Sequence, residues 1–342
     1  MSELVTLIEE AMADGNATLE SAIFETNDAS VIARQVETFL QSEFGADPQF
    51  IFYRHSVGVV VGARLGEQQV VLKIHRWLAS IERLAAIQRV QGAYFSMGLP
   101  APRPLVGPTN FAAGIATVED FLAGDVADGH DSDVRRTLAH ELQRFISAGR
   151  NVTDVRGLEP SALTSVPGDA LWPTPHAPRF DFEATKGGAE WIDEFAHMAQ
   201  WRLAGLKGEK VIGYLDWRVG NLGFVGSKMT AIYDWDSVGL ATEAFIVGSA
   251  AATFSSDWSK ANGSVPNLEE MRAFVSEYQD VRGRAFDGYE LDVVDAANLV
   301  LIAYGARCQH SDAVLARDQA GAVARSWIEL LKERGERGLL EG

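Results

Sequence analysis

The stretch YLDWRVGNLGFVGSKMTAIYDWDS, residues 214–237, constrains this chain most, because polar side chains stand at the ends of apolar runs. The runs LGFV and MTAIY are typical of short strands. Asp216, Asn221, Asp234 and Asp236 follow or precede these runs. Such residues could serve only turns and caps in a surface hairpin. Alternatively, their oxygen atoms could hold a hard cation such as Mg²⁺.

The spacing of these residues favours a site over a simple hairpin. Asp216 and Asn221 form the pattern D-W-R-V-G-N. Kinase-type phosphoryl transfer uses a carboxylate to orient and deprotonate the attacking hydroxyl, and an amide oxygen to hold magnesium. Asp234 comes at the end of the second apolar run, where a carboxylate could bridge magnesium between nucleotide phosphates. The flanking strands and the D-W-D sequence strengthen a pattern that would be weak alone.

The first third of the chain is predicted to be a small antiparallel sheet with one helix, preceded by helices. Helical spacing of apolar residues covers 3–13 and 29–43. Runs rich in Val, Ile and Phe predict strands within 50–64 and 68–77, joined by a turn. A helix is expected over 78–97, and two further strands follow it.

The rest of the chain is predicted to be mainly helical. We expect an N-terminal helical segment over 1–48, a sheet-containing lobe over 49–122 and a helical lobe over 123–342. The stretch described first interrupts the helical lobe with short strands. Its last part carries helical patterns near 240–256, 267–284, 290–309 and 313–334.

Residues 214–237 resemble the catalytic and metal loops of the aminoglycoside phosphotransferase-like family, small-molecule kinases with the protein-kinase-like fold. The family pattern is H-G-D-x-x-x-x-N, then an apolar strand and I-D-W-[DE]. The resemblance implies a two-lobed α+β fold with a small antiparallel-sheet N-lobe and a larger mainly helical C-lobe. It makes Asp216 the catalytic base and Asn221 and Asp234 magnesium ligands, and it places Arg218 near the transferring phosphate. Tyr214 stands where the family has a histidine.

The same resemblance assigns nucleotide contacts in the N-lobe. Lys73, inside VVLKIH, would hold the α- and β-phosphates of ATP or GTP. A lysine in an apolar strand is costly unless its ammonium meets an anion, although a strand-edge lysine can also reach water. The family's helix glutamate is replaced by Gln88. We expect Gln88 or Gln91 to give Lys73 a neutral hydrogen bond instead.

Two other segments of the N-lobe complete the expected nucleotide site. The turn RHSVGVV would bring the backbone N–H groups of Ser56 and Gly58 near the phosphates, although a lone glycine in a hairpin is often only a turn. VEDFLAG resembles the hinge, where backbone groups of Glu119 to Phe121 would meet the adenine.

The acceptor is expected to be a small hydroxylated molecule such as an aminoglycoside or amino sugar. The net charge of −17 suits a cationic acceptor and argues against nucleic acid, whose phosphates are held mainly by Lys and Arg. Candidate substrate residues are Asp236, Asp257 and Trp258, although acidic residues on helices are often only solvated. Trp217 and Trp235 are expected to fill the core rather than stack on a sugar.

Composition narrows the remaining possibilities. Cys308 is the only cysteine, so an intramolecular disulfide is excluded, and a buried inert thiol is expected. No apolar run is long enough to span a membrane, and the acidic N-terminus lacks the pattern of a secretion signal, so we expect a cytoplasmic protein without a membrane partner.

Three functions therefore remain open. The first is a small-molecule kinase using ATP and Mg²⁺. The second is a nucleotide-binding pseudokinase with a regulatory or scaffolding role, motivated by Gln88 and Tyr214. The third is a metal-dependent hydrolase using Asp234 and Asp236, for which the neighbouring sequence offers no histidine.

Overall fold

The computed structural model describes residues 3–13, 17–55, 57–76, 80–166, 170–177, 179–257, 265–315, 326–335 and 337–340. The chain folds into two compact units. The first, here called the sheet unit, contains Met1–Leu122 and Asp154–Gly157. The second, the helical unit, contains Ala123–Thr153 and Leu158–Gly342.

The sheet unit is built on five antiparallel strands in the order β1-β2-β3-β5-β4. They are β1 (Gln49–His55), β2 (Val59–Leu65), β3 (Gln68–His75), β4 (Pro104–Phe111) and β5 (Gly114–Asp120). The strands predicted from Val, Ile and Phe content are therefore present. β3 is the central strand, with β2 on one side and β5 on the other. A side chain of β3 therefore has a neighbouring strand on each side.

The register between β3 and β5 decides which side chains share a face of the sheet. Lys73 lies opposite Thr117, and Val71 lies opposite Glu119. Because side chains alternate along a strand, Lys73 and Glu119 point to the same face and are diagonal neighbours.

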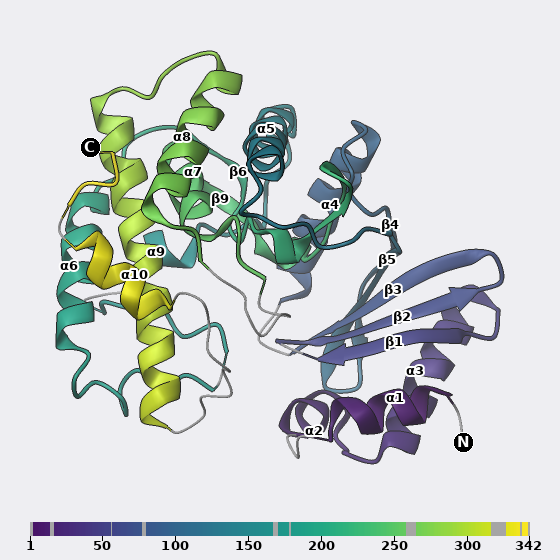
Figure 1. Cartoon of the computed structure of the whole chain (residues 1–342). Coiled ribbons are helices and arrows are strands. Elements are labelled where there is room, and N and C mark those ends of the chain that lie inside the picture. Colours follow the sequence, from purple (N-terminus) through teal and green to yellow (C-terminus); the bar gives the residue numbers. More distant parts are fainter. Residues whose placement is uncertain are drawn as a thin grey trace. The chain divides into compact units, whose positions relative to one another are not determined.

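Helices α1 (Glu3–Ala11), α2 (Thr18–Phe24) and α3 (Ala29–Phe44) lie together along one face of this sheet (Figure 1). Their apolar residues form one core with the apolar residues of the sheet, including Leu72 and Ile74 on either side of Lys73. The carboxylate of Asp28 accepts from the N–H groups of Ser30 and Val31, so Asp28 is the N-cap of α3.

Helix α4 (Ile81–Ser96) contacts β4. Ser80 caps its start by accepting from the Arg83 N–H at 3.0 Å. Residues 154–157 return to this unit and pack on α4. The Arg89 guanidinium donates to the Arg156 carbonyl at 3.1 Å, and a side chain at Gly157 would lie 3.1 Å from the Ala86 Cβ.

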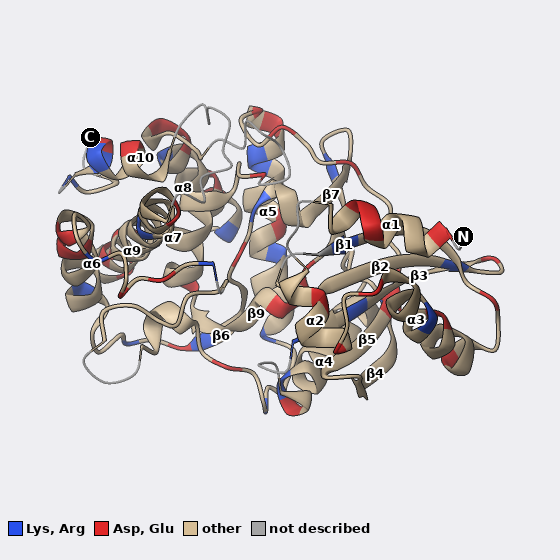
Figure 2. Ribbon diagram, turned by 90° about the horizontal axis from the view of Figure 1, so that it is seen from below, with Lys and Arg blue, Asp and Glu red and all other residues tan. Residues whose placement is uncertain are grey.

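The helical unit contains α5 (Ser132–Gly149), α6 (Glu190–Leu203), α7 (Glu243–Thr253), α8 (Leu268–Arg282), α9 (Gly288–Val314) and α10 (Trp327–Arg334). Helix α9 packs against α6, α7 and α10. Helix α6 has acidic residues in its first turn and Arg202 in its last turn. Figure 2 shows both signs of charge on this helix. Such charges at helix ends complement the helix dipole.

Two short antiparallel ribbons interrupt these helices. β6 (Lys210–Tyr214) pairs with β9 (Val238–Thr242), and β7 (Leu222–Val225) pairs with β8 (Lys228–Ile232). The β7–β8 ribbon also bonds to the segment after the sheet unit, through Asp125 and Phe224 at 2.8 and 2.9 Å. Gly124 allows this approach, because a Cβ there would lie 2.6 Å from the Gly223 Cα.

Some predicted elements differ from the structure in extent. The pattern near 240–256 contains the end of β9 before α7 begins at Glu243, and the pattern near 313–334 contains the end of α9 and the shorter α10. Helix α2 was not expected. Among the described residues, no helix has the length and apolar character needed to cross a membrane.

Candidate active site

Asp216 follows β6, and two neighbours in its own loop hold its carboxylate. The Arg218 Nε lies 3.1 Å from Oδ1 and 3.0 Å from Oδ2 of Asp216. The Asn221 side-chain nitrogen donates to the Asp216 carbonyl at 3.0 Å and to Oδ2 at 2.7 Å. The Asp216 side chain is nevertheless 38% exposed. Its orientation is therefore fixed while part of the carboxylate remains open to a substrate.

Asn221 is buried and connects this loop to the next one. Its N–H donates to the Arg218 carbonyl at 2.9 Å, and its carbonyl accepts from the Tyr233 N–H at 2.9 Å. Because the nitrogen end of its side chain faces Asp216, the amide oxygen faces the other way. That oxygen is the atom a magnesium ion would take.

Asp234 directly follows Tyr233 and has a backbone conformation that is uncommon for a residue other than glycine. Its φ of 44° and ψ of 52° lie in the left-handed region. Its carbonyl accepts from the Ser237 N–H at 3.1 Å, which closes the short turn Trp235–Ser237. Strained residues of this kind persist only where the surrounding structure holds them, and they are frequent at functional sites.

Tyr214 provides part of that support. Its hydroxyl donates to the carbonyls of Tyr233 and Asp234, at 2.8 and 3.1 Å. Burial raises the pKa of Tyr214 well above its usual value, and the charges of Asp234 and Asp216 raise this pKa further. The hydroxyl therefore keeps its proton and remains a donor. Tyr214 therefore ties the strand before Asp216 to the loop of Asp234.

An aromatic cluster packs beneath both loops. The Phe145 ring of α5 lies 6.0 Å from the rings of Tyr214 and Trp217, and 5.8 Å from that of Trp235, measured between centroids. The two indole N–H groups donate to the carbonyls of Leu138 and Ile232. Both tryptophans are fully buried, which confirms that they belong to the core.

The loop of Asp216 is also tied to the segment after α7. The Val219 and Gly220 N–H groups donate to the Phe254 and Ser256 carbonyls, at 2.9 and 3.2 Å. Gly220 lies so close that a Cβ there would be 3.3 Å from the Asp257 Cα. Asp257 is buried beside the loop of Asp216.

The other two candidate substrate residues are Asp236 and Trp258, and the structure describes only Asp236. Asp236 lies in the turn after Asp234, and its charge also raises the pKa of Tyr214. Trp258 is outside the described residues.

Sequence reasoning missed a group of side chains from the connector before α6. His176 meets the Tyr304 hydroxyl at 2.9 Å from Nδ1. Burial lowers the pKa of His176, and the Asp216 charge opposes this shift. Arg179 pairs with Asp312 of α9 and acts on the same histidine. No local pattern links a Pro-rich connector to Asp216, so only the fold reveals this group.

In the sheet unit, Lys73 has an acidic partner that the sequence did not suggest. Its Nζ lies 2.8 Å from Oε1 of Glu119, and the Gln91 side-chain nitrogen donates to Oε2 at 2.7 Å. Gln88 lies elsewhere, since its side-chain nitrogen donates to the Val106 carbonyl at 2.8 Å. The expected role of Gln88 is therefore corrected: the amide of α4 that reaches this group is Gln91.

The remaining nucleotide candidates have structural partners of their own. The Phe121 N–H donates to the Gln69 carbonyl at 3.0 Å, so this N–H is already used within the sheet unit. At Gly58, a Cβ would lie 2.7 Å from the Ile74 carbonyl oxygen, so the hairpin itself requires glycine. Ser56 lies outside the described residues.

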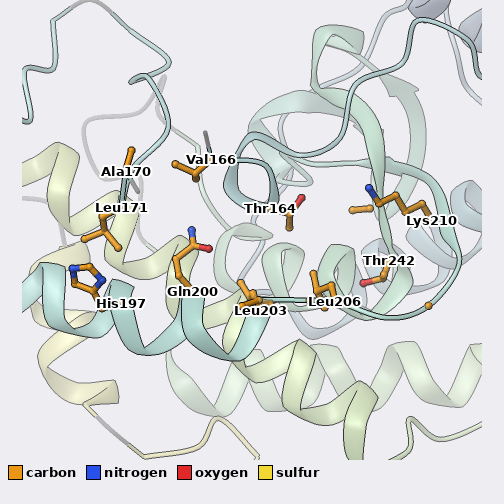
Figure 3. A pocket seen from close by; sticks show the side chains of 14 residues that line it. Thr164, Val166, Ala170, Leu171, His197, Gln200, Leu203, Leu206, Lys210 and Thr242 are labelled. Atoms are coloured by element: carbon orange, nitrogen blue, oxygen red, sulfur yellow. The ribbon is translucent and has the colours of Figure 1, made fainter. Parts of the chain in front are cut away.

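A hollow of about 440 Å³ in the helical unit contains none of the candidate residues. His197, Gln200 and Leu203 of α6 line one side of it, and Lys210 and Thr242 of the β6–β9 ribbon line another (Figure 3).

No protein-family model matches the chain, and no curated protein matches it. Solved structures do. A microcompartment-associated aminopropanol kinase matches with a TM-score of 0.58 and 13% identity, over 85% of this chain and 99% of that one. A spectinomycin phosphotransferase, solved with ADP and spectinomycin, matches with a TM-score of 0.55 and 13% identity, over 90% and 96%.

A macrolide 2'-phosphotransferase from Brachybacterium faecium also matches, with a TM-score of 0.50 and 14% identity, over 82% of this chain and 93% of that one. At these identities the likeness concerns the fold. The expected α+β architecture, an antiparallel-sheet part followed by a mainly helical part, is thereby confirmed. The chain has the kinase-like fold of the aminoglycoside phosphotransferases and related small-molecule kinases.

Proposed function

We propose that this protein is an ATP-dependent phosphotransferase that moves the γ-phosphate to a hydroxyl group of a small molecule. The observation that carries the proposal is the half-open carboxylate of Asp216, oriented by Arg218 and Asn221. A base that accepts the proton of an attacking hydroxyl must be both fixed and accessible, and Asp216 satisfies both conditions.

The chemistry assigned to each residue follows from its contacts. Asp216 orients the acceptor hydroxyl and takes its proton as the oxygen bonds to the γ-phosphorus and ADP leaves. Arg218 is held 3.0 Å from the same carboxylate, and its positive charge would stabilise negative charge that develops on the transferred phosphate. Lys73 holds the α- and β-phosphates.

The residues present suit a magnesium ion. The described residues contain no group of three or more His, Cys, Asp or Glu side chains that could hold a metal by themselves. Magnesium in kinases is instead held by one or two protein oxygens together with nucleotide phosphates. The Asn221 amide oxygen and the Asp234 carboxylate would provide these two protein ligands. When bound, the ion neutralises phosphate charge.

The nucleotide is proposed to be ATP, because the spectinomycin phosphotransferase was solved with ADP, and an aminoglycoside phosphotransferase of TM-score 0.51 was solved with AMP-PNP and hygromycin B. For the acceptor, we propose an aminoglycoside, an amino sugar or a similar hydroxylated metabolite. The negative charge of the chain favours a cationic acceptor.

The pseudokinase alternative rested on two departures from the family pattern. In the structure a contact takes the place of each missing residue. Tyr214 donates to the carbonyl of Asp234, and Glu119 pairs with Lys73. These contacts support an active kinase over a degenerate one.

The test is ADP release by the purified chain over a panel of aminoglycosides, amino sugars, macrolides and amino alcohols. With an acceptor identified, Asp216→Asn should lower kcat by about 10²- to 10⁴-fold, as expected for loss of a general base. Nucleotide binding should remain. Asp133→Asn, on the exposed start of α5, is the control and should keep wild-type activity. An Asp216→Asn variant with wild-type kcat would refute the role of this carboxylate.

A further inference from the structure

Lys73 and Glu119 form a buried ion pair between neighbouring strands of the sheet unit. Their side chains are 11% and 10% exposed, and the nitrogen and oxygen are 2.8 Å apart. A buried carboxylate is costly unless it is paired and hydrogen-bonded. Here one oxygen of Glu119 meets Lys73 and the other accepts from Gln91, which is almost fully buried. Both oxygens of Glu119 are therefore used.

Helix α4 offers no acidic residue for this purpose. Its one acidic residue is Glu82, in the first turn. Glu82 lies beside Gly157, where a Cβ would be 3.5 Å from the Glu82 Cγ. In protein kinases, the lysine of this strand pairs with a glutamate of the helix that follows it. In this chain the helix contributes the amide of Gln91, and the negative charge comes from β5.

We propose that Glu119 is the positioning residue for Lys73, and that Gln91 fixes Glu119 from the helix. Relative to the kinase arrangement, the acid has moved from the helix to β5, an exchange of elements in which the helix keeps only an amide. This inference rests on the proposed function, because positioning matters only if Lys73 holds nucleotide phosphates.

The exchange has a physical consequence for the lysine. Lys73 and Glu119 are diagonal neighbours on strands joined by a continuous backbone ladder. A pair held within one sheet keeps its geometry when a helix shifts, whereas a pair between a sheet and a helix depends on the position of the helix. The Lys73–Glu119 contact is therefore set by strand pairing, and α4 contributes to it only through the Gln91 hydrogen bond.

Three variants test the exchange: Glu119→Gln, Gln91→Glu and the double variant that carries both. Glu119→Gln removes the negative charge and should lower kcat by about 10- to 100-fold, the equivalent of one charge-assisted hydrogen bond. Gln91→Glu places two carboxylates around one ammonium and should also lower kcat, because like charges in a buried site oppose each other. The double variant restores one acid and one amide, and should recover most of the lost kcat.

The second measurement does not depend on turnover. An ammonium held by a carboxylate keeps its proton and reacts slowly with acylating reagents. Acetic anhydride labelling, followed by peptide mass spectrometry, should therefore modify Lys73 faster in Glu119→Gln than in the wild type. The double variant should return to the slow rate. Exposed Lys228 is the reference in each sample.

Glu20→Gln is the matched control. Glu20 is also fully buried in the sheet unit, where it accepts from the Tyr53 hydroxyl at 3.1 Å on the face covered by α1–α3. This variant removes a buried carboxylate without touching Lys73, so kcat and Lys73 labelling should stay at wild-type values.

Recovery of kcat in the double variant separates a positioning role from a general structural role. If each substitution only damaged the structure, the two losses of kcat would add in the double variant. Wild-type kcat and labelling in Glu119→Gln would overturn the proposal, as would a double variant no better than Glu119→Gln alone. If Glu119→Gln does not fold, the double variant still carries the comparison with the wild type. If the wild type transfers no phosphate to any acceptor, the proposed function fails, and the labelling result still decides the pairing of Lys73.

Discussion

Single hydroxyl and amide groups hold the candidate catalytic loops in place. Tyr214 bonds two carbonyls of the Asp234 loop, and Asn221 bonds both the carboxylate and the carbonyl of Asp216. Neither contact involves a charged donor, and the Tyr214 hydroxyl that connects the two loops keeps its proton because burial raises its pKa. The sequence pattern singled out Asp216, Asn221 and Asp234. It did not predict that the Tyr214 hydroxyl would bond the Asp234 loop.

At the residue scale, Tyr214→Phe removes this hydroxyl while keeping the ring in its aromatic cluster. Two carbonyls lose a buried donor, which should lower the free energy of unfolding by about 1–3 kcal/mol. Because the lost contact supports Asp234, kcat should fall as well. Urea unfolding and steady-state kinetics provide the two measurements.

Tyr278→Phe is the matched control for this prediction. Tyr278 is also fully buried, and its hydroxyl donates to Glu243 at 2.7 Å, between α8 and α7. This variant should lose comparable stability but keep wild-type kcat. Equal losses of kcat in both variants would show that Tyr214 acts only through general stability.

At the scale of elements, close helix packing shapes the core of the helical unit. Helix α9 is buried around much of its circumference by α6, α7 and α10. Its sequence therefore has no simple polar face, although the pattern over 290–309 still predicted a helix. Helix α2 was not predicted, because its seven residues are too few to show a helical repeat of apolar side chains.

Gly248→Ala tests the packing of α7 against α9. A Cβ at Gly248 would lie 2.2 Å from the Val294 carbonyl oxygen, so the helices must move apart. Overpacking of this kind should lower the free energy of unfolding by about 1–3 kcal/mol, measured by urea unfolding. Gly288→Ala, at the first residue of α9 with nothing within 4 Å of the new Cβ, should be neutral or slightly stabilising. A fully stable Gly248→Ala variant would contradict the packing described here.

At the scale of the whole molecule, nucleotide and metal binding should appear as a gain in global stability. A ligand at 100 times its Kd adds about 2.7 kcal/mol to the free energy of unfolding. We expect ATP with Mg²⁺ to raise the Tm, and excess EDTA to reduce this gain. In Asp234→Asn the Tm with ATP should no longer depend on magnesium, because a ligand of the ion is lost. The same magnesium dependence in Asp234→Asn and the wild type would remove Asp234 from the metal site.

The sequence by itself determined the local features of this protein. Val- and Ile-rich runs specified β1 to β3, Asp28 specified the start of α3, and the spacing of Asp216, Asn221 and Asp234 suggested the chemistry. These features depend on a few neighbouring residues, so periodicity and capping are sufficient to predict them.

Only the tertiary structure decided which distant side chains meet. Lys73 and Glu119 are brought together by the pairing of β3 with β5, and His176 meets Tyr304 across 128 residues of sequence. The choice of Glu119 rather than a residue of α4, and of Gln91 rather than Gln88, depends on strand register and helix rotation. Register and rotation are set by the packing of the whole core, and a local sequence pattern contains no record of them.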